Sequence, residues 1–112
     1  MKTLNIHTGN HQTITIMQTE RLFERMRGLI KRTLDKEHVA GLWIIPCNAV
    51  HTIGMNYPLD LIYVDKNNTV VKVIKNIGQG QFSGALKAHS VIEMYAGATQ
   101  DLDIKIGDTI HV

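Results

Sequence analysis

The sequence contains one cysteine, two prolines and few aromatic residues, and these shortages exclude several classes of protein. A single cysteine permits no internal disulfide, which fits a reducing compartment. Aromatic residues make up 5% of the chain, too few for a platform on which single-stranded nucleic acid would stack. The formal charge of +2 at pH 7 is too small to indicate a nucleic-acid partner by itself.

Long apolar runs are also absent from the sequence. The longest such run is a few residues, far short of the roughly 20 that a membrane span needs. The first residues, Met1 to Asn5, contain neither an apolar signal segment nor a small-residue cleavage site. We therefore expect a cytoplasmic protein with no membrane partner. At 112 residues and 44% apolar content, the chain predicts a single domain over residues 1–112.

Alternating apolar and polar residues predict several short strands. The first two alternating stretches flank a polar turn at residues 8–11, so they predict a hairpin. A second hairpin is predicted at residues 65–68, where Asp-Lys-Asn-Asn separates two β-branched runs. The expected strands cover residues 3–7, 13–16, 42–45, 59–64, 69–77, 90–95 and 109–112.

One main helix is predicted near residues 19–31. Thr19 is a candidate N-cap, and apolar residues recur at helical spacing on one face between Leu22 and Ile30. Thr99 would cap one further helical turn near the C-terminus. The glycine-rich stretch 78–84 predicts a mobile loop, because no helix follows that would complete a phosphate-binding loop.

About seven short strands with one main helix predict an α+β fold dominated by antiparallel β-sheet. The pattern Ile-Gly-Asp-Thr-Ile at residues 106–110 is similar to the last turn of several small β-barrels. We therefore expect the sheet to be partly closed in a barrel-like arrangement.

Reactive side chains are concentrated in residues 43–65. This stretch holds the only tryptophan, the only cysteine and both prolines, and the prolines bound an irregular segment between two apolar runs. The pattern predicts a strand, a loop and a second strand, with the reactive groups on the loop.

Several motifs follow one another along nearly the whole chain: MRGLI at 26–30, CNAVHTIGM at 47–55, PLD at 58–60, Glu93 ahead of Ala96 and Gly97, and Gly-Asp at 107–108. Together they resemble the domain-of-unknown-function family 192. The resemblance implies a small, mostly β domain of bacteria and archaea, and it brings no established activity. Many members resemble secreted proteins with an N-terminal signal sequence, and this chain departs from them at its first residues.

Cys47, His51 and Met55 are spaced four residues apart on the central loop and suggest a metal site. A thiolate, an imidazole and a thioether select copper, and the first two also suit zinc. A blue-copper loop normally precedes only the final strand, however, whereas nearly half of this chain follows Met55. The structural alternative is that Cys47 and Met55 fill the core. We predict no resident cofactor and keep copper or zinc as an open alternative.

A thiol-dependent hydrolase is a further hypothesis, with Cys47 as nucleophile, His51 as base and Asp60 orienting the imidazole. Such enzymes generally place the cysteine at a helix N-terminus, where the helix dipole activates the thiol. Cys47 instead follows a proline at the end of a predicted strand, so a partly buried structural thiol is the favoured interpretation.

Asp60 lies between two leucines inside an apolar strand, where an unpaired carboxylate would be strongly destabilising. A cation or hydrogen-bond donors must therefore face it. Arg27, at the edge of the apolar face of the predicted helix, is the natural candidate, and His51 or Thr52 are others. Arg27 would either tie the helix to the sheet or converge with His51 and Asp60 on a polar pocket.

The sequence thus favours a binding module over an enzyme, with a polar site formed by the 46–60 loop and Arg27. Its expected partner is a small polar or anionic ligand or another protein. Glu93, between apolar neighbours, faces either the same site or solvent. Arginines on the predicted helix lie near Glu20 and Glu24 and indicate a solvated face rather than a nucleic-acid interface. The expected ligand-binding residues are Arg27, Cys47, His51, Thr52, Met55, Asp60 and Glu93.

Overall fold

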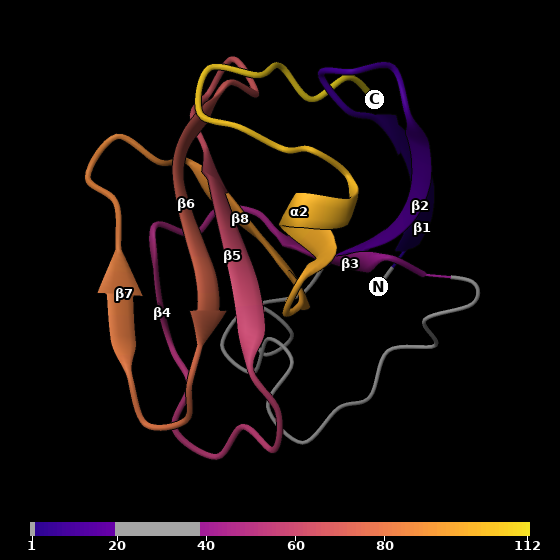
Figure 1. Cartoon of the computed structure of the whole chain (residues 1–112). Coiled ribbons are helices and arrows are strands. Elements are labelled where there is room, and N and C mark those ends of the chain that lie inside the picture. The colour runs from indigo at the N-terminus through magenta and orange to yellow at the C-terminus, as the bar shows by residue number, and fades with distance from the viewer. Residues whose placement is uncertain (1, 20–38) are drawn as a thin grey trace.

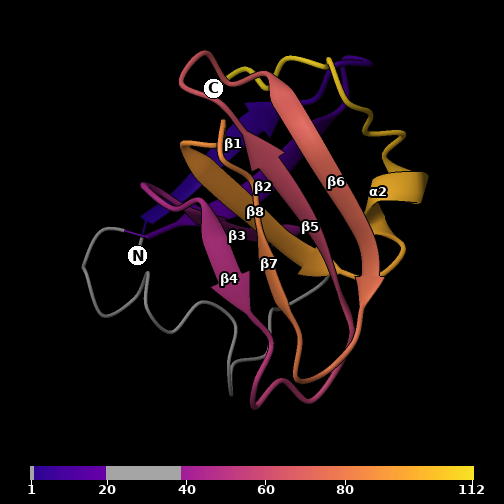
Figure 2. The same cartoon turned by 90° about the vertical axis from the view of Figure 1, so that its left-hand side faces the viewer.

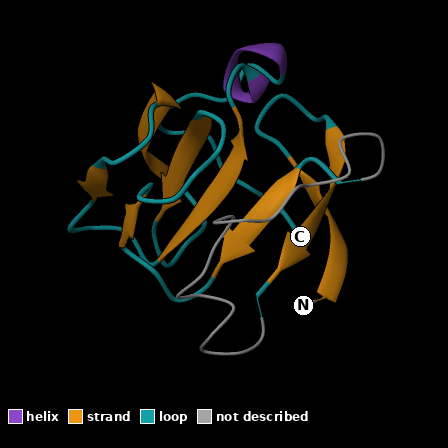
Figure 3. Cartoon of the chain, turned by 90° about the horizontal axis from the view of Figure 1, so that it is seen from below, coloured by secondary structure: helices purple, strands orange, loops and turns teal. Residues whose placement is uncertain are grey.

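The computed structural model describes residues 2–19 and 39–112, and Figure 1 shows the path of the chain. Eight strands and one short helix lie in these two ranges (Figure 3). The predicted main helix lies outside the described residues except for Thr19, whose hydroxyl accepts a hydrogen bond from the Ile45 N–H (3.3 Å). The elements are β1 (Lys2–His7), β2 (Thr13–Gln18), β3 (Gly41–Ile44), β4 (Ala49–His51), β5 (Leu59–Val64), β6 (Val70–Ile77), β7 (Phe82–Gly84), β8 (Ser90–Tyr95) and α2 (Ala98–Asp101).

Six of the strands form one twisted sheet in the order β1-β2-β3-β8-β5-β6 (Figure 2). Every neighbouring pair is antiparallel except β2 and β3, which run parallel. The middle of the sheet is the most apolar part, and every residue of β5 is buried. The prediction of a mostly β protein with an antiparallel-rich sheet is therefore confirmed.

The sheet buries side chains on both faces, because successive residues of a strand point to opposite sides. One face packs against α2 and the C-terminal segment, and we call it the α2 face. The other is partly covered by a two-stranded ribbon of β4 and β7, and we call it the ribbon face (Figure 1). The α2 face holds Trp43, Ile62, Val64, Ile92 and Met94, and the ribbon face holds Leu42, Ile44, Leu59, Leu61, Tyr63 and Val91.

The turn at residues 65–68 forms the predicted hairpin between β5 and β6. The Asp65 carboxylate accepts hydrogen bonds from the backbone N–H groups of Asn67 (2.8 Å) and Thr69 (3.0 Å). Asn68 adopts a φ of 61°, a left-handed conformation that asparagine tolerates better than most residues. The first hairpin, between β1 and β2, is confirmed as well.

The C-terminal segment links the two outer parts of the sheet. It makes two isolated bridges, Thr69 with Thr109 and His7 with His111, where a strand over residues 109–112 was expected. Strands β1 and β6 are the outer strands of the sheet within the described ranges. The predicted partial closure into a barrel is therefore not confirmed.

Candidate functional site

Asp60 is fully buried, and its carboxylate is surrounded by hydrogen-bond donors. One oxygen accepts from the Asn76 N–H (2.9 Å). The other accepts from the Gly97 N–H (3.1 Å), the Thr99 N–H (3.0 Å) and the Thr99 hydroxyl (2.7 Å). These four donors satisfy the carboxylate. The sequence had predicted that either a cation or hydrogen-bond donors would face it. The proposed cation Arg27 lies outside the described residues.

The position of Thr99 differs from the prediction. The residue that caps α2 is Gly97, at a φ of 98°, which has no side chain to make a capping bond, and the Asp60 carboxylate accepts from the N–H groups there instead. The Thr99 hydroxyl points into the protein and donates to Asp60 instead. The prediction of Thr99 as an N-cap is therefore wrong, because a buried carboxylate competes for its hydroxyl.

Thr52 joins the two halves of the ribbon. Its hydroxyl donates to the Gly78 carbonyl oxygen (2.6 Å) and accepts from the Gln81 N–H (2.8 Å). Its backbone N–H donates to the Gln81 carbonyl oxygen (2.8 Å). The glycine-rich stretch is thus held against the central loop and ends in β7, so the prediction of a loop throughout residues 78–84 is wrong for its last three residues.

The ribbon carries two exposed rings on its outer face. His51 and Phe82 are cross-strand partners, and their ring centroids lie 6.1 Å apart with an angle of 51° between the planes. Phe82 is 77% exposed, an unusual position for a phenylalanine. Val50, between Ala49 and His51, packs toward the ribbon-face core, so the alternation of the strand directs Ala49 and His51 outward.

A surface pocket of about 430 Å³ lies beside these rings. Ala49 pairs with Gly84 next to the His51–Phe82 pair, so two small residues adjoin two large ones. Both small residues line the pocket together with the rings. The complete lining is Ala49, Val50, His51, Phe82, Ser83 and Gly84, in which His51 is the one ionisable side chain.

Two side-chain bonds fix β7 over the sheet. The Tyr63 hydroxyl, on β5, donates to the Ser83 hydroxyl (3.0 Å). The Lys72 ammonium, on β6, donates to the Gly84 carbonyl oxygen (2.6 Å). The floor of the ribbon pocket is therefore anchored to the main sheet through Ser83 and Gly84.

The three expected soft-metal ligands lie in different surroundings. Met55 is buried in the core of the ribbon face, whereas His51 is exposed on the ribbon. Cys47 is half-buried, and its thiol donates to the Ala49 carbonyl oxygen (3.1 Å). Cys47 lines a separate cleft of about 300 Å³, and the histidine that lines this cleft is His89 and not His51. No group of three or more histidine, cysteine, aspartate or glutamate side chains that could hold a metal lies within residues 2–19 and 39–112.

Glu93 lies inside the ribbon face, where it is 5% exposed. Burial, together with the nearby Tyr95 and the Glu93 carboxylate, raises the pKa of Tyr57 to about 12. Burial also raises the pKa of Tyr63, the hydrogen bond to Ser83 acts in the opposite direction, and the Glu93 carboxylate adds to the effect of burial. The rings of Tyr57 and Tyr95 lie 4.8 Å apart. All three tyrosines of the chain therefore gather near Glu93.

The sequence reasoning missed these tyrosines and Phe82. Tyr63 shares its strand face with Leu59 and Leu61, and Tyr95 shares its face with Glu93, so period-two alternation could have placed both. Phe82 had no such signal, because a strand of three residues is too short to show alternation. The structure places Thr52, His51 and Cys47 on or beside the ribbon, and it places Asp60 against α2.

A protein-family model described as DUF192, Uncharacterized ACR, matches residues 4–112, which confirms the resemblance seen in the motifs. A solved structure of a protein of unknown function from Novosphingobium aromaticivorans DSM 12444 is 21% identical, with a TM-score of 0.83. That match covers 98% of this chain and 85% of the other. A putative transcription regulator from Sinorhizobium meliloti 1021 is 19% identical, with a TM-score of 0.79 and coverage of 96% and 89%.

At such identities the likeness to these two structures shows the fold alone. The search of curated proteins gave no match. Within the described ranges, no helix has the length and apolar character that crossing a membrane requires.

Proposed function

The chain belongs to the DUF192 family, and we propose that it is a small binding module whose site is the pocket on the outer face of the β4–β7 ribbon. The proposed ligand has a flat apolar group and a negative charge. One observation carries this proposal: the exposed His51–Phe82 ring pair at the edge of a pocket in an anchored ribbon.

The shape of the pocket supports a flat ligand. Its volume of about 430 Å³ falls in the range of small-molecule sites. Ala49 and Gly84 leave open space beside the rings of His51 and Phe82, so a planar group can lie on the ribbon backbone there and contact the Phe82 ring.

Exposed apolar residues lie on the ribbon and at both of its ends. Ile53 follows β4 and is about half exposed, Phe82 is on β7, and Leu86, just after β7, is fully exposed. Leaving such side chains in water is unfavourable, so a ligand or partner that covers them is stabilised. These residues therefore support a ligand that lies along the ribbon.

The charge of the ribbon supports an anion. Residues 46–58 and 78–89, which form the ribbon and its loops, contain no aspartate or glutamate. They contain His51, Lys87 and His89 instead. A negatively charged ligand therefore meets no carboxylate from these two segments, and the His51 ring can donate a hydrogen bond to it.

We propose binding rather than catalysis because the pocket lining offers a single ionisable group, His51. The Cys47 thiol donates to a backbone carbonyl oxygen, an arrangement that uses the protonated form and not a thiolate nucleophile. One cysteine held as a thiol is also compatible with the cytoplasm, the compartment that we propose.

The test uses phenyl phosphate, in which a flat ring bears a negatively charged phosphate group. Neutral phenol is the control. Titration of the 15N-labelled full chain should shift the amide signals of residues 49–51 and 82–84 in a saturable manner. Phenol should bind more weakly, because it lacks the charge. Phenyl phosphate that shifts no ribbon signals, or binds no better than phenol, would refute the proposal.

A further inference from the structure

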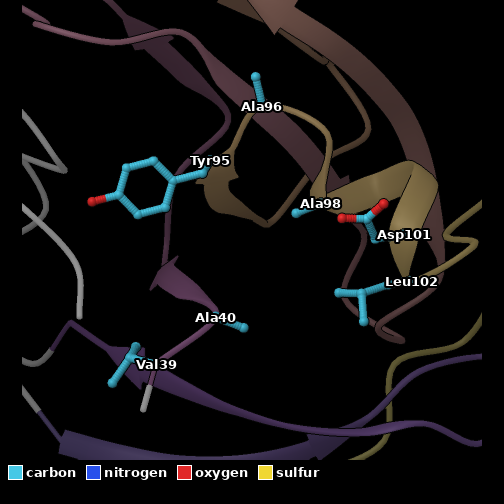
Figure 4. Close-up of a pocket in the computed structure, with 7 residues that line it drawn as sticks. All are labelled: Val39, Ala40, Tyr95, Ala96, Ala98, Asp101 and Leu102. Carbon is cyan, nitrogen blue, oxygen red and sulfur yellow. The ribbon is translucent and has the colours of Figure 1, made fainter. Parts of the chain in front are cut away.

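A second pocket, of about 300 Å³, lies where the chain enters β3 and leaves β8 (Figure 4). Val39 and Ala40 precede β3, Tyr95 is the last residue of β8, and Ala96 follows it. Helix α2 and the residue after it complete the lining with Ala98, Asp101 and Leu102. The pocket shares no residue with the one on the ribbon.

Most of this pocket is apolar, and its charge comes from one carboxylate. Asp101 is exposed, and Figure 4 shows one of its oxygens directed from α2 toward the side of the pocket where Tyr95 lies. Among the described residues, Asp101 has no ion pair, since the nearby Lys105 bonds to Asp103 (3.4 Å). The Asp101 carboxylate is thus available to a ligand.

Tyr95 provides an aromatic wall across the pocket from Asp101. Its ring packs against the ring of Tyr57, with the centroids 4.8 Å apart, and its hydroxyl points away from Asp101 (Figure 4). A carboxylate beside an apolar space attracts an organic cation, by charge pairing with the ammonium group and by burial of the apolar body.

We propose that this pocket binds a small organic cation, an ammonium group on a short apolar body. The ammonium group pairs with Asp101, and the apolar body contacts Val39, Ala98 and Leu102. This ligand is opposite in charge to the one proposed for the ribbon, and the inference does not depend on that proposal.

The buried Asp60 carboxylate positions one wall of this pocket. It accepts hydrogen bonds from the backbone of Gly97 and Thr99, on either side of Ala98. Ala98 and Leu102 also pack against the core of the α2 face. The short helix is therefore held in place before a ligand arrives, which lowers the cost of ordering on binding.

The experiment titrates the 15N-labelled full chain with n-butylammonium, and separately with n-butanol and butyrate, which have similar apolar bodies. Butylammonium should give saturable shifts at Val39, Ala40, Ala98, Asp101 and Leu102, and the other two compounds should bind at least fivefold more weakly. Absence of saturable shifts at these residues, or equal binding of butanol, would overturn the proposal.

Two variants and one control identify the site. Asp101→Asn should weaken butylammonium binding at least fivefold, and Ala98→Leu should weaken it by filling the pocket without changing the charge. Asp103→Asn removes the same charge two residues away and should leave the affinity within twofold of the wild type. Equal losses in Asp101→Asn and Asp103→Asn would show a response to net charge alone and would overturn the proposal.

Discussion

The Thr99 hydroxyl donates a 2.7 Å hydrogen bond to the carboxylate of Asp60, although the two residues are 39 positions apart in the chain. Asp60 is on β5, an inner strand of the six-stranded sheet, and Thr99 is the second residue of α2. The bond therefore ties the short helix to an inner strand of the sheet. It also explains how a carboxylate is accommodated in a strand whose other residues are all apolar or aromatic.

Replacing either partner should destabilise the fold. Thr99→Val removes a buried donor to a charged group and should lower the free energy of unfolding by about 1.5–3 kcal/mol. Asp60→Asn puts an amide donor among four donors and should cost at least as much, roughly 3 kcal/mol or more. Urea denaturation followed by tryptophan fluorescence measures both.

The matched control for this prediction is Asp101→Asn, because Asp101 is an exposed carboxylate on the same helix. Its effect on stability should stay within about 0.5 kcal/mol. If Asp60→Asn lowered the free energy of unfolding as little as Asp101→Asn does, the four hydrogen bonds to Asp60 would not stabilise the packing of α2 on the sheet.

The tyrosines near Glu93 predict a loss of stability at alkaline pH. Because the pKa of Tyr57 is raised to about 12, the folded state holds this phenolic proton more tightly than the unfolded chain, in which tyrosine titrates near 10. The stabilising contribution is complete below pH 10 and is lost as the pH rises to about 12. Tyr57→Phe should flatten this part of the stability profile, measured by denaturation at several pH values. A slope that Tyr57→Phe leaves unchanged would contradict the assignment.

The Thr52 hydroxyl should stabilise the attachment of the glycine-rich stretch 78–84 to the segment that follows β4. Thr52→Val removes the hydroxyl that bonds to Gly78 and Gln81, which should cost about 1–2 kcal/mol. Amide hydrogen exchange should become faster at Gln81 and Phe82 in particular. The control is Thr15→Val, which removes an exposed hydroxyl bonded to Asn5 and should leave exchange in the ribbon unchanged. Equal exchange in both variants would show that Thr52 does not anchor the ribbon.

Cys47→Ser distinguishes the binding module from the two alternatives that depend on the thiol. Cys47 is outside the ribbon pocket, so the variant should bind phenyl phosphate within twofold of the wild type. A soft-metal site would lose copper or zinc in this variant, and a thiol hydrolase would lose turnover. Metal content by elemental analysis of untagged wild type and variant provides the independent check, and metal that disappears with Cys47 would favour the soft-metal alternative.

Strands long enough to show alternation were predictable from the sequence. The six residues of β5 and of β8 were identified because a short apolar run bounded by turn residues is typical of a buried strand. The strands β4 and β7 have three residues each, and their pairing depends on hydrogen bonds made by Thr52 to a segment 26 or more positions away. Local patterns carry no information about such contacts.

The buried carboxylate of Asp60 also depends on contacts between distant segments, which local sequence patterns do not encode. The sequence indicated that Asp60 needs partners, because burial of a lone charge is strongly unfavourable. It could not identify them, since three of the four donors are backbone N–H groups, which every residue except proline has. His51 was predicted on an irregular loop, but it is the last residue of the short strand β4, and its ring partner Phe82 is 31 positions away.

The measurement that tests the central claim most directly is the affinity of phenyl phosphate for the wild type, Phe82→Ala and His51→Gln. Loss of the stacking ring in Phe82→Ala should weaken binding about tenfold, which corresponds to about 1.4 kcal/mol. His51→Gln should weaken binding about threefold, because a neutral amide still donates a hydrogen bond but cannot become charged.

The control is Ile106→Ala, which removes an apolar side chain of similar exposure (66%) outside the ribbon. The account predicts an affinity within twofold of the wild type for Ile106→Ala and a clear loss for both ribbon variants. Affinities that are equal in Phe82→Ala, Ile106→Ala and the wild type would contradict it, because the His51–Phe82 pair would then not form the binding site.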